Sequence, residues 1–346
     1  MRIQGRGYAF IVAVVASFIL KQPELLVTGQ ATVPAMFVLG DSLVDVGNNN
    51  FLASVARANY LPYGIDLNFR PTGRFSNGMN FGDRFSLSQQ VVNLEGTLSQ
   101  LRTMMSPQNF TDYLKKSLVV LVFGSNDYLN NYLMPNLYSS SFRYKPPEFA
   151  NLLINQYARQ LLTLYSLGLR KVFIAGVGPL GCIPNQRATA PPGRCVDSVN
   201  QILGTFNQGL RSLVDQLNQR SPGAIYVYGN TYRAVGDILN NPATYGINLL
   251  LDYIADDKRS FYEYQKRLMY CTGFSIADRA CCGTGRNQGQ ITCLPLQNPC
   301  PNRSQYVFWD AFHPTQTANS ILVRRAFYGP PTDAYPVNVQ QMTLLP

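Results

Sequence analysis

The sequence predicts a doubly wound α/β sandwich, in which helices cover both faces of a mostly parallel sheet, and two observations lead to this prediction. The first is a set of short, continuous apolar runs that are each followed by glycine: 35–39, 118–123, 171–175 and 224–228. Such runs are typical of strands buried on both faces. The second is a set of segments with apolar residues at three- and four-residue steps, as in helices: 147–167, 196–219 and 315–327. Alternating strands and helices of this kind place ligands at the carboxyl ends of the strands.

The length and the N-terminus predict one exported domain. No linker, repeat or low-complexity tract interrupts the 346 residues. Residues 1–30 are typical of a secretory signal peptide, because basic residues precede an apolar run that is too short for a confident membrane span. We therefore expect a single domain over 31–346 that is secreted to the extracellular space of the apoplast or cell wall.

The net charge of the chain limits the classes of partner that we expect. The formal net charge is +10, and removal of the N-terminal segment would lower it by two. A basic surface can attract nucleic acid, an anionic membrane surface or an acidic wall polysaccharide. Because the chain has no dense run of Lys and Arg with interleaved aromatics and is expected to be exported, nucleic acid is excluded. Association with the cell wall or a membrane surface stays open.

The seven cysteines favour an oxidising compartment. Cys182 and Cys195 flank a Pro-rich loop that a disulfide could close, and the other five are crowded into 271–300. Zinc is the competing interpretation, but paired C-x-x-C units are absent. We expect disulfides with one thiol left over, and the pairing stays open. Asn109 and Asn302 begin N-glycosylation motifs and are expected at the surface.

His313 is the only histidine in the chain. If the chain performs hydrolysis with an imidazole base, the base has to be His313. Asp310 lies three residues upstream, at a spacing from which a turn can bring a carboxylate to Nδ1 of the ring. The structural alternative is a core or capping histidine beside Trp309 and Phe312.

Three further segments could complete such a site. Ser42 follows the first predicted strand, where a turn can expose its hydroxyl, although Val44 stands where the G-x-S-x-G elbow requires glycine. The glycine-rich run 73–78 can turn a backbone N–H toward a ligand. Asn126 follows the second predicted strand and could donate to a developing oxyanion. Each segment also has an ordinary explanation, as a helix cap or a loop.

Together and in this order, these segments resemble the plant GDSL esterase/lipase family of the SGNH hydrolase superfamily. The matching segments are Gly40-Asp41-Ser42 with its preceding strand, 73–78, 122–128, 176–182, 281–283 and 309–314. The resemblance implies a three-layer α/β/α sandwich with a flavodoxin-like sheet, an acyl ester or lipid as a small-molecule substrate, no metal or organic cofactor, and a monomer.

The resemblance also implies the roles of individual residues. Ser42 would be the nucleophile and His313 the base, oriented by Asp310. The oxyanion hole would consist of the Ser42 N–H, the Gly78 N–H and the Asn126 side chain. Two other functions stay open: an acyltransferase that uses the same acyl-enzyme, and a secreted binding protein on an inherited hydrolase fold.

The chain departs from the family after Gly78. In the family a long helix follows this motif, whereas here 79–81 runs directly into 82–90 and several dozen residues are absent. The family fold implies that the absent residues supply a crossover helix and an edge strand beside the strand that ends at Ser42. We hypothesise that this is a shortened variant, and the exposed strand edge predicts a tendency to aggregate.

Overall fold

The computed structural model describes residues 32–51, 57–78, 86–245 and 273–346. The chain divides into two units, Met1–Thr32 and Val33–Pro346. The expected signal peptide over 1–30 and the departure from the family after Gly78 lie outside the described residues. The second unit carries all the elements that follow.

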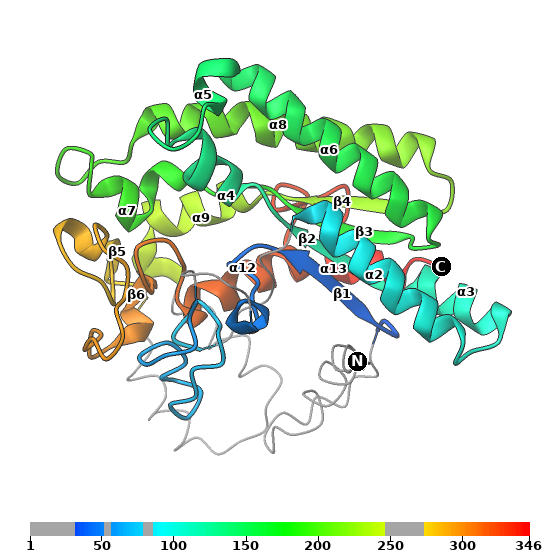
Figure 1. The fold of residues 1–346 in the computed structure, drawn as a ribbon, viewed down its shortest axis with the longest axis horizontal. Helices are drawn as coiled ribbons and strands as arrows, with labels where there is room; N and C mark the ends of the chain where they lie inside the picture. Colours follow the sequence, from blue (N-terminus) through cyan, green and yellow to red (C-terminus); the bar gives the residue numbers. More distant parts are fainter. Residues whose placement is uncertain (1–31, 52–56, 79–85, 246–272) are drawn as a thin grey trace, which may run out of the picture. The chain divides into compact units, whose positions relative to one another are not determined.

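The main sheet has five strands in the order β1-β2-β3-β4-β7 (Figure 1). The first four are parallel, and β7 pairs antiparallel with β4. Their bounds are β1 Met36–Gly40, β2 Leu118–Val122, β3 Lys171–Ala175, β4 Ile225–Gly229 and β7 Ala334–Tyr335. The four apolar runs are therefore strands, as predicted. Gly40 lies opposite Val122, so β1 and β2 end at the same level, and residues just beyond them lie near one another.

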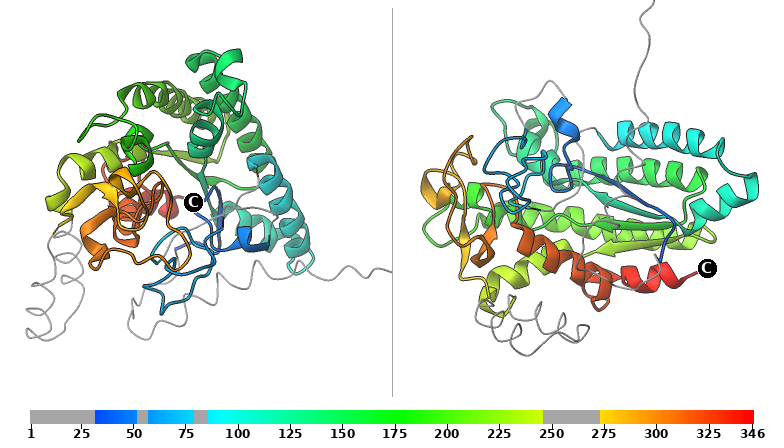
Figure 2. Two further views of the ribbon diagram at one scale, coloured as in Figure 1. Left: turned by 60° about the vertical axis from the view of Figure 1, so that its left-hand side comes forward. Right: turned by 90° about the horizontal axis from the view of Figure 1, so that it is seen from below.

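Helices cover both faces of this sheet (Figures 1 and 2). The longer ones are α2 Leu87–Arg102, α3 Pro107–Lys116, α6 Pro146–Ser166, α8 Asp197–Arg220, α9 Thr231–Asn240, α12 Gln316–Tyr328 and α13 Val339–Leu344. The short ones are η1 Asn48–Phe51, α4 Ser125–Asp127, η2 Tyr128–Tyr132, α5 Ser140–Arg143, η3 Leu180–Cys182, α7 Pro184–Arg187, η4 Pro242–Tyr245, η5 Arg286–Gln288 and η6 Arg303–Gln305. The predicted helical segments correspond to α6, α8 and α12.

Alternate residues of the strands supply two separate cores, because successive side chains of a strand point to opposite faces. Val172 and Ile174 pack in the cluster that contains α2, α6 and α8. Phe173 and Ala175 pack in another cluster with Met342 of α13. Helices, sheet and helices thus form the predicted three-layer α/β/α sandwich.

β1 is the edge strand of this sheet within the described residues, where it pairs with β2 alone. Residues 36–38 of β1 are half-buried, whereas all five residues of β3 are buried. At the end of β1, the buried Gln90 of α2 forms two hydrogen bonds with Gly40: it accepts from the Gly40 N–H at 2.9 Å and donates to the Gly40 carbonyl at 2.8 Å. A side chain therefore satisfies the backbone that a neighbouring strand would otherwise pair.

A second, two-stranded sheet, β5 Ile276–Ala280 and β6 Tyr306–Phe308, leads into the histidine segment. Three disulfides are present: Cys182–Cys195, Cys281–Cys300 and Cys282–Cys293. The predicted closure of the Pro-rich loop is confirmed, and disulfides, not zinc, explain these six cysteines. Cys271 lies outside the described residues.

Two further findings concern the glycosylation motifs and membrane spans. Asn109 and Asn302 are both exposed, as expected for glycosylation acceptors, and their glycosylation stays a prediction. None of the helices in the described ranges is long and apolar enough to cross a membrane.

Candidate active site

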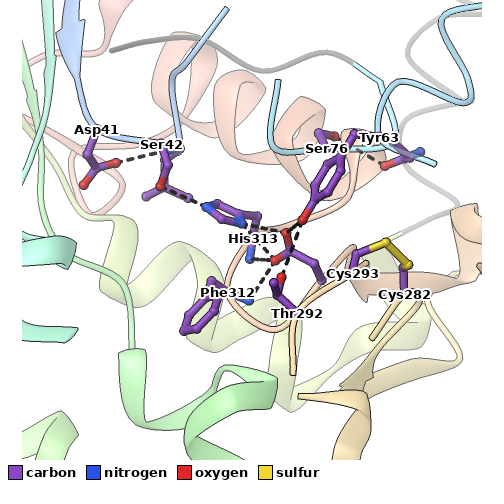
Figure 3. Close-up of polar contacts among 12 residues, drawn as sticks. Asp41, Ser42, Tyr63, Ser76, Cys282, Thr292, Cys293, Phe312 and His313 are labelled. Carbon is purple, nitrogen blue, oxygen red and sulfur yellow. Dashed lines mark hydrogen bonds and ion pairs between the residues drawn. A yellow bond between two sulfur atoms is a disulfide. The ribbon is translucent and has the colours of Figure 1, made fainter. Parts of the chain in front are cut away.

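A tight turn holds Ser42 directly after β1. The Asp41 N–H donates to the Val122 carbonyl of β2 at 3.0 Å, which continues the strand pairing by one residue. The Leu43 N–H then donates to Asp41 Oδ1 at 3.1 Å, and the Val44 N–H donates to the Asp41 carbonyl at 3.0 Å. Asp41 therefore shapes the turn with both its backbone and its side chain, and Ser42 lies at its tip (Figure 3).

His313 lies between β6 and α12, and its ring reaches Ser42. Nε2 is 2.9 Å from Ser42 Oγ, although the two residues are 271 positions apart (Figure 3). The His313 carbonyl accepts from the Trp309 N–H at 2.8 Å, which fixes the segment, and the ring packs against Phe75 with 4.9 Å between centroids. After it, the Thr315 hydroxyl caps the start of α12 by accepting from the Ala318 N–H.

Asp310 is fully buried and lies against the other side of the ring. His313 Nδ1 is 2.8 Å from Asp310 Oδ1 and 2.9 Å from Oδ2. Oδ1 also accepts from the backbone N–H groups of Phe312 and His313, each at 2.8 Å. Burial opposes ionisation, yet the charge of His313 and the hydrogen bonds hold the pKa of Asp310 below its ordinary value. The three-residue spacing thus produces the predicted contact between the carboxylate and Nδ1.

Asn126 follows β2 at the same end of the sheet as Ser42. Gly124 begins the turn with a φ of 115°, a conformation that favours glycine. The Asn126 Oδ1 accepts from Asn130 Nδ2 at 2.7 Å, so the Nδ2 group of Asn126 is the end of the amide that can donate to a ligand. Asn130 lies in η2, a π-helical turn of the kind often found at functional sites.

The run 73–78 packs against the start of α12. Asn77 Oδ1 accepts from the Gln316 N–H at 2.9 Å, and a Cβ on Gly78 would lie 1.5 Å from Gln316 Oε1. A larger residue at this position would therefore require the Gln316 side chain to move. The Gly78 N–H donates to Ser76 Oγ at 3.2 Å, within its own turn. The contribution of Gly78 to an oxyanion hole stays a prediction.

Two carboxyl groups near Ser42, those of the buried Asp41 and the half-buried Asp127, have raised pKa values. Burial raises the pKa of Asp41 to about 6; the negative charge of Asp127 adds to this effect, and the Leu43 N–H and His313 oppose it. Burial also raises the pKa of Asp127. Within the described ranges, no group of three His, Cys, Asp or Glu side chains is placed to hold a metal ion.

One residue of the site, Tyr63, was not predicted. The hydroxyl of the buried Tyr63 donates to Asp310 Oδ2 at 2.7 Å, across 247 positions of sequence (Figure 3). No spacing pattern links residues so far apart, so the sequence contains no signal for this contact.

A parallel α/β sandwich that brings a serine, a histidine and an aspartate together at the carboxyl ends of its strands has the arrangement found in serine hydrolases. The chain belongs to the GDSL-like lipase/acylhydrolase family, whose model matches residues 36–326. It is 67% identical over 394 residues to GDSL esterase/lipase At1g71250 of Arabidopsis thaliana, covering 100% of this chain and 98% of the relative. GDSL esterase/lipase At5g08460 of the same plant is 45% identical over 368 residues, covering 91% of this chain and 89% of the relative. The chain is accordingly a carboxylic ester hydrolase.

The first comparison also shows a difference in length. The alignment with At1g71250 runs over 394 positions, whereas this chain has 346 residues, so 48 positions have no residue of this chain. The aligned span of this relative is thus several dozen residues longer than the chain, and the place of the difference after Gly78 stays a prediction.

Proposed function

We propose that this protein is a secreted serine esterase that hydrolyses acyl or lipid esters through Ser42, His313 and Asp310. The observation that carries the proposal is the continuous hydrogen-bonded chain from Ser42 Oγ to His313 Nε2 at 2.9 Å and from His313 Nδ1 to Asp310 at 2.8 Å. A buried, ionised carboxylate beside Nδ1 places the proton on that nitrogen and leaves Nε2 as the acceptor that faces the serine.

The reaction has two stages. In the first, His313 Nε2 takes the proton of Ser42 as Oγ attacks the ester carbonyl, and the same proton then passes to the departing alcohol. This step leaves an acyl group on Ser42. In the second stage, His313 takes a proton from water, the hydroxide attacks the acyl carbonyl, and the proton returns to Ser42 as the acid leaves. Asp310 stabilises the imidazolium in both stages.

The negative charge on the carbonyl oxygen requires hydrogen-bond donors. We assign this role to Nδ2 of Asn126, with the N–H groups of Ser42 and Gly78. Asn126 has the strongest support, because Asn130 holds its Oδ1 and leaves its Nδ2 as the donor. Losing one such donor costs about 3–4 kcal/mol of transition-state stabilisation.

Secretion belongs to the same proposal. Three disulfides are characteristic of an oxidising compartment, and the first 30 residues have the pattern of a signal peptide. We assign the protein to the apoplast or cell wall as a monomer, where its net charge, +10 less the two charges of the removed segment, suits association with acidic wall polymers or membrane surfaces.

The test is hydrolysis of p-nitrophenyl acetate and butyrate by the purified protein, beside Ser42→Ala and His313→Ala at matched folded concentrations. The proposal predicts turnover by the wild type and its loss in both variants. Turnover that survives either substitution would disprove the assignment. No turnover by folded wild-type protein would instead favour a binding protein that has kept the hydrolase fold.

A further inference from the structure

We propose that Tyr63 is a positioning residue for the catalytic carboxylate: its hydroxyl holds Asp310 in the orientation that receives Nδ1–H of His313. This inference rests on the proposed function. It concerns a hydrogen bond that joins Asp310 to a residue outside the segment 310–313, so it links the site to a separate part of the fold.

The two carboxylate oxygens of Asp310 accept different sets of hydrogen bonds. Oδ1 accepts from the Phe312 and His313 N–H groups, which belong to its own turn, and from Nδ1. Oδ2 shares Nδ1 at 2.9 Å and accepts from the Tyr63 hydroxyl at 2.7 Å. Since an ionised carboxylate only accepts hydrogen bonds, the phenol must be the donor. Tyr63 therefore fixes the oxygen that the local turn leaves less constrained.

The Tyr63 ring is itself held rigidly. The residue is 1% exposed, and Tyr60, Phe75 and Trp309 surround it in edge-to-face contacts with centroid distances of 5.2, 6.0 and 6.0 Å. The Tyr63 N–H also donates to the Tyr60 carbonyl at 3.1 Å. A ring confined in this way can hold a carboxylate in place, because moving the hydroxyl would require its neighbours to repack.

The loop that carries the Cys282–Cys293 disulfide lies against the same tyrosines (Figure 3). Cys293, which is bonded to Cys282, accepts at its carbonyl from the Tyr60 hydroxyl at 2.9 Å. Thr292 Oγ1 lies 3.5 Å from the Tyr63 hydroxyl. The Cys282 N–H donates to the Trp309 carbonyl at 2.8 Å, next to Asp310 in sequence. The loop thus fixes both the tyrosine pair and the segment that carries Asp310.

The consequence of removing the hydroxyl follows from burial. Asp310 is fully buried, so water cannot replace a lost donor easily. Burial already opposes the ionised form, and the hydrogen bond from Tyr63 is one of the contacts that lower the pKa of Asp310. Without this hydrogen bond, we expect the pKa of Asp310 to rise and its carboxylate to rotate away from the ring.

The kinetic test compares Tyr63→Phe with Tyr226→Phe, a control that removes a hydroxyl from a fully buried tyrosine of β4. Both variants keep the aromatic ring. Thermal unfolding is measured first, to check that each variant is folded. We expect Tyr63→Phe to lower kcat for p-nitrophenyl butyrate about 10-fold, the value of one hydrogen bond to a charged group, with KM changed less than about twofold. In an Asp310→Asn background the same substitution should change kcat by less than about twofold. Equal losses in both backgrounds would overturn the positioning role.

A second readout does not depend on turnover. Because His313 is the only histidine, labelling with ¹⁵N-histidine gives a single imidazole in the NMR spectrum. We expect the low-field Nδ1–H signal to shift or exchange faster in Tyr63→Phe and to stay unchanged in Tyr226→Phe. An unaltered signal in Tyr63→Phe would overturn the inference. Ser42→Ala tests the proposed function separately, because it abolishes turnover while Tyr63 and Asp310 remain in place.

Discussion

The raised pKa of Asp41 predicts that this carboxyl makes the fold less stable as pH rises. The pKa of Asp41 rises from 3.8 to about 6 on folding, chiefly because the group is fully buried. Below pH 3.8 both the folded and unfolded states are protonated, and the group has no cost. As pH rises toward 6, the unfolded state loses the proton more readily, so stability falls. The shift corresponds to about 3 kcal/mol at pH 7.

Asp41→Asn isolates this effect. The amide oxygen can still accept from the Leu43 N–H, so the turn at Ser42 is kept, and the buried charge is absent. We expect the variant to gain up to about 3 kcal/mol over the wild type at pH 7 and nothing at pH 3.5. The same substitution removes a negative charge that faces His313, so kcat should fall at pH 7.5.

The assay is urea unfolding of both proteins at pH 3.5, 5, 6 and 7, followed by tryptophan fluorescence. Asp112→Asn, which changes a partly exposed carboxyl on α3, is the control. The difference between Asp41→Asn and wild type should grow with pH through the window from about 4 to 6. A constant difference, or one that reverses sign so that the wild type gains stability as pH rises, would refute the reasoning.

Two more substitutions test the framework of the site. Asn126→Ala removes the proposed oxyanion donor and should lower kcat about 10²–10³-fold with little change in the circular dichroism spectrum; an unchanged kcat would exclude that role. Gln90→Leu leaves the buried N–H and carbonyl of Gly40 without their partner and should lower the free energy of unfolding by about 2–4 kcal/mol in urea titrations. Gln89→Leu, on the exposed side of α2, is the control and should change stability by less than about 0.5 kcal/mol.

The predictable part of the structure depends on local patterns. The four parallel strands followed from uninterrupted apolar runs, and the contact between Asp310 and His313 followed from a spacing that one turn can close. The pairing of Ser42 with His313 followed from motif order and the resemblance to the family. The helix α2 was not predicted, because Ser, Gln and Asn interrupt its apolar positions. It forms through packing on the sheet, which overrides weak local preference.

The unpredicted part depends on contacts between distant residues. Tyr63 forms a hydrogen bond with Asp310, 247 positions away in the sequence. Gln90 does the same with Gly40, 50 positions away. Neither tyrosine nor glutamine has a spacing that reveals such a partner. The pairing of Cys281, Cys282, Cys293 and Cys300 was likewise open, because adjacent cysteines allow more than one connectivity and only the fold selects among them.

The most direct test of the central claim is labelling of the purified protein with a serine-directed fluorophosphonate, followed by mass spectrometry of its peptides. We expect one adduct, on Ser42, because His313 raises the nucleophilicity of that hydroxyl alone. Labelling should disappear in His313→Ala while the variant remains folded. An adduct on another serine, or none on folded wild-type protein, would contradict the proposed serine esterase mechanism.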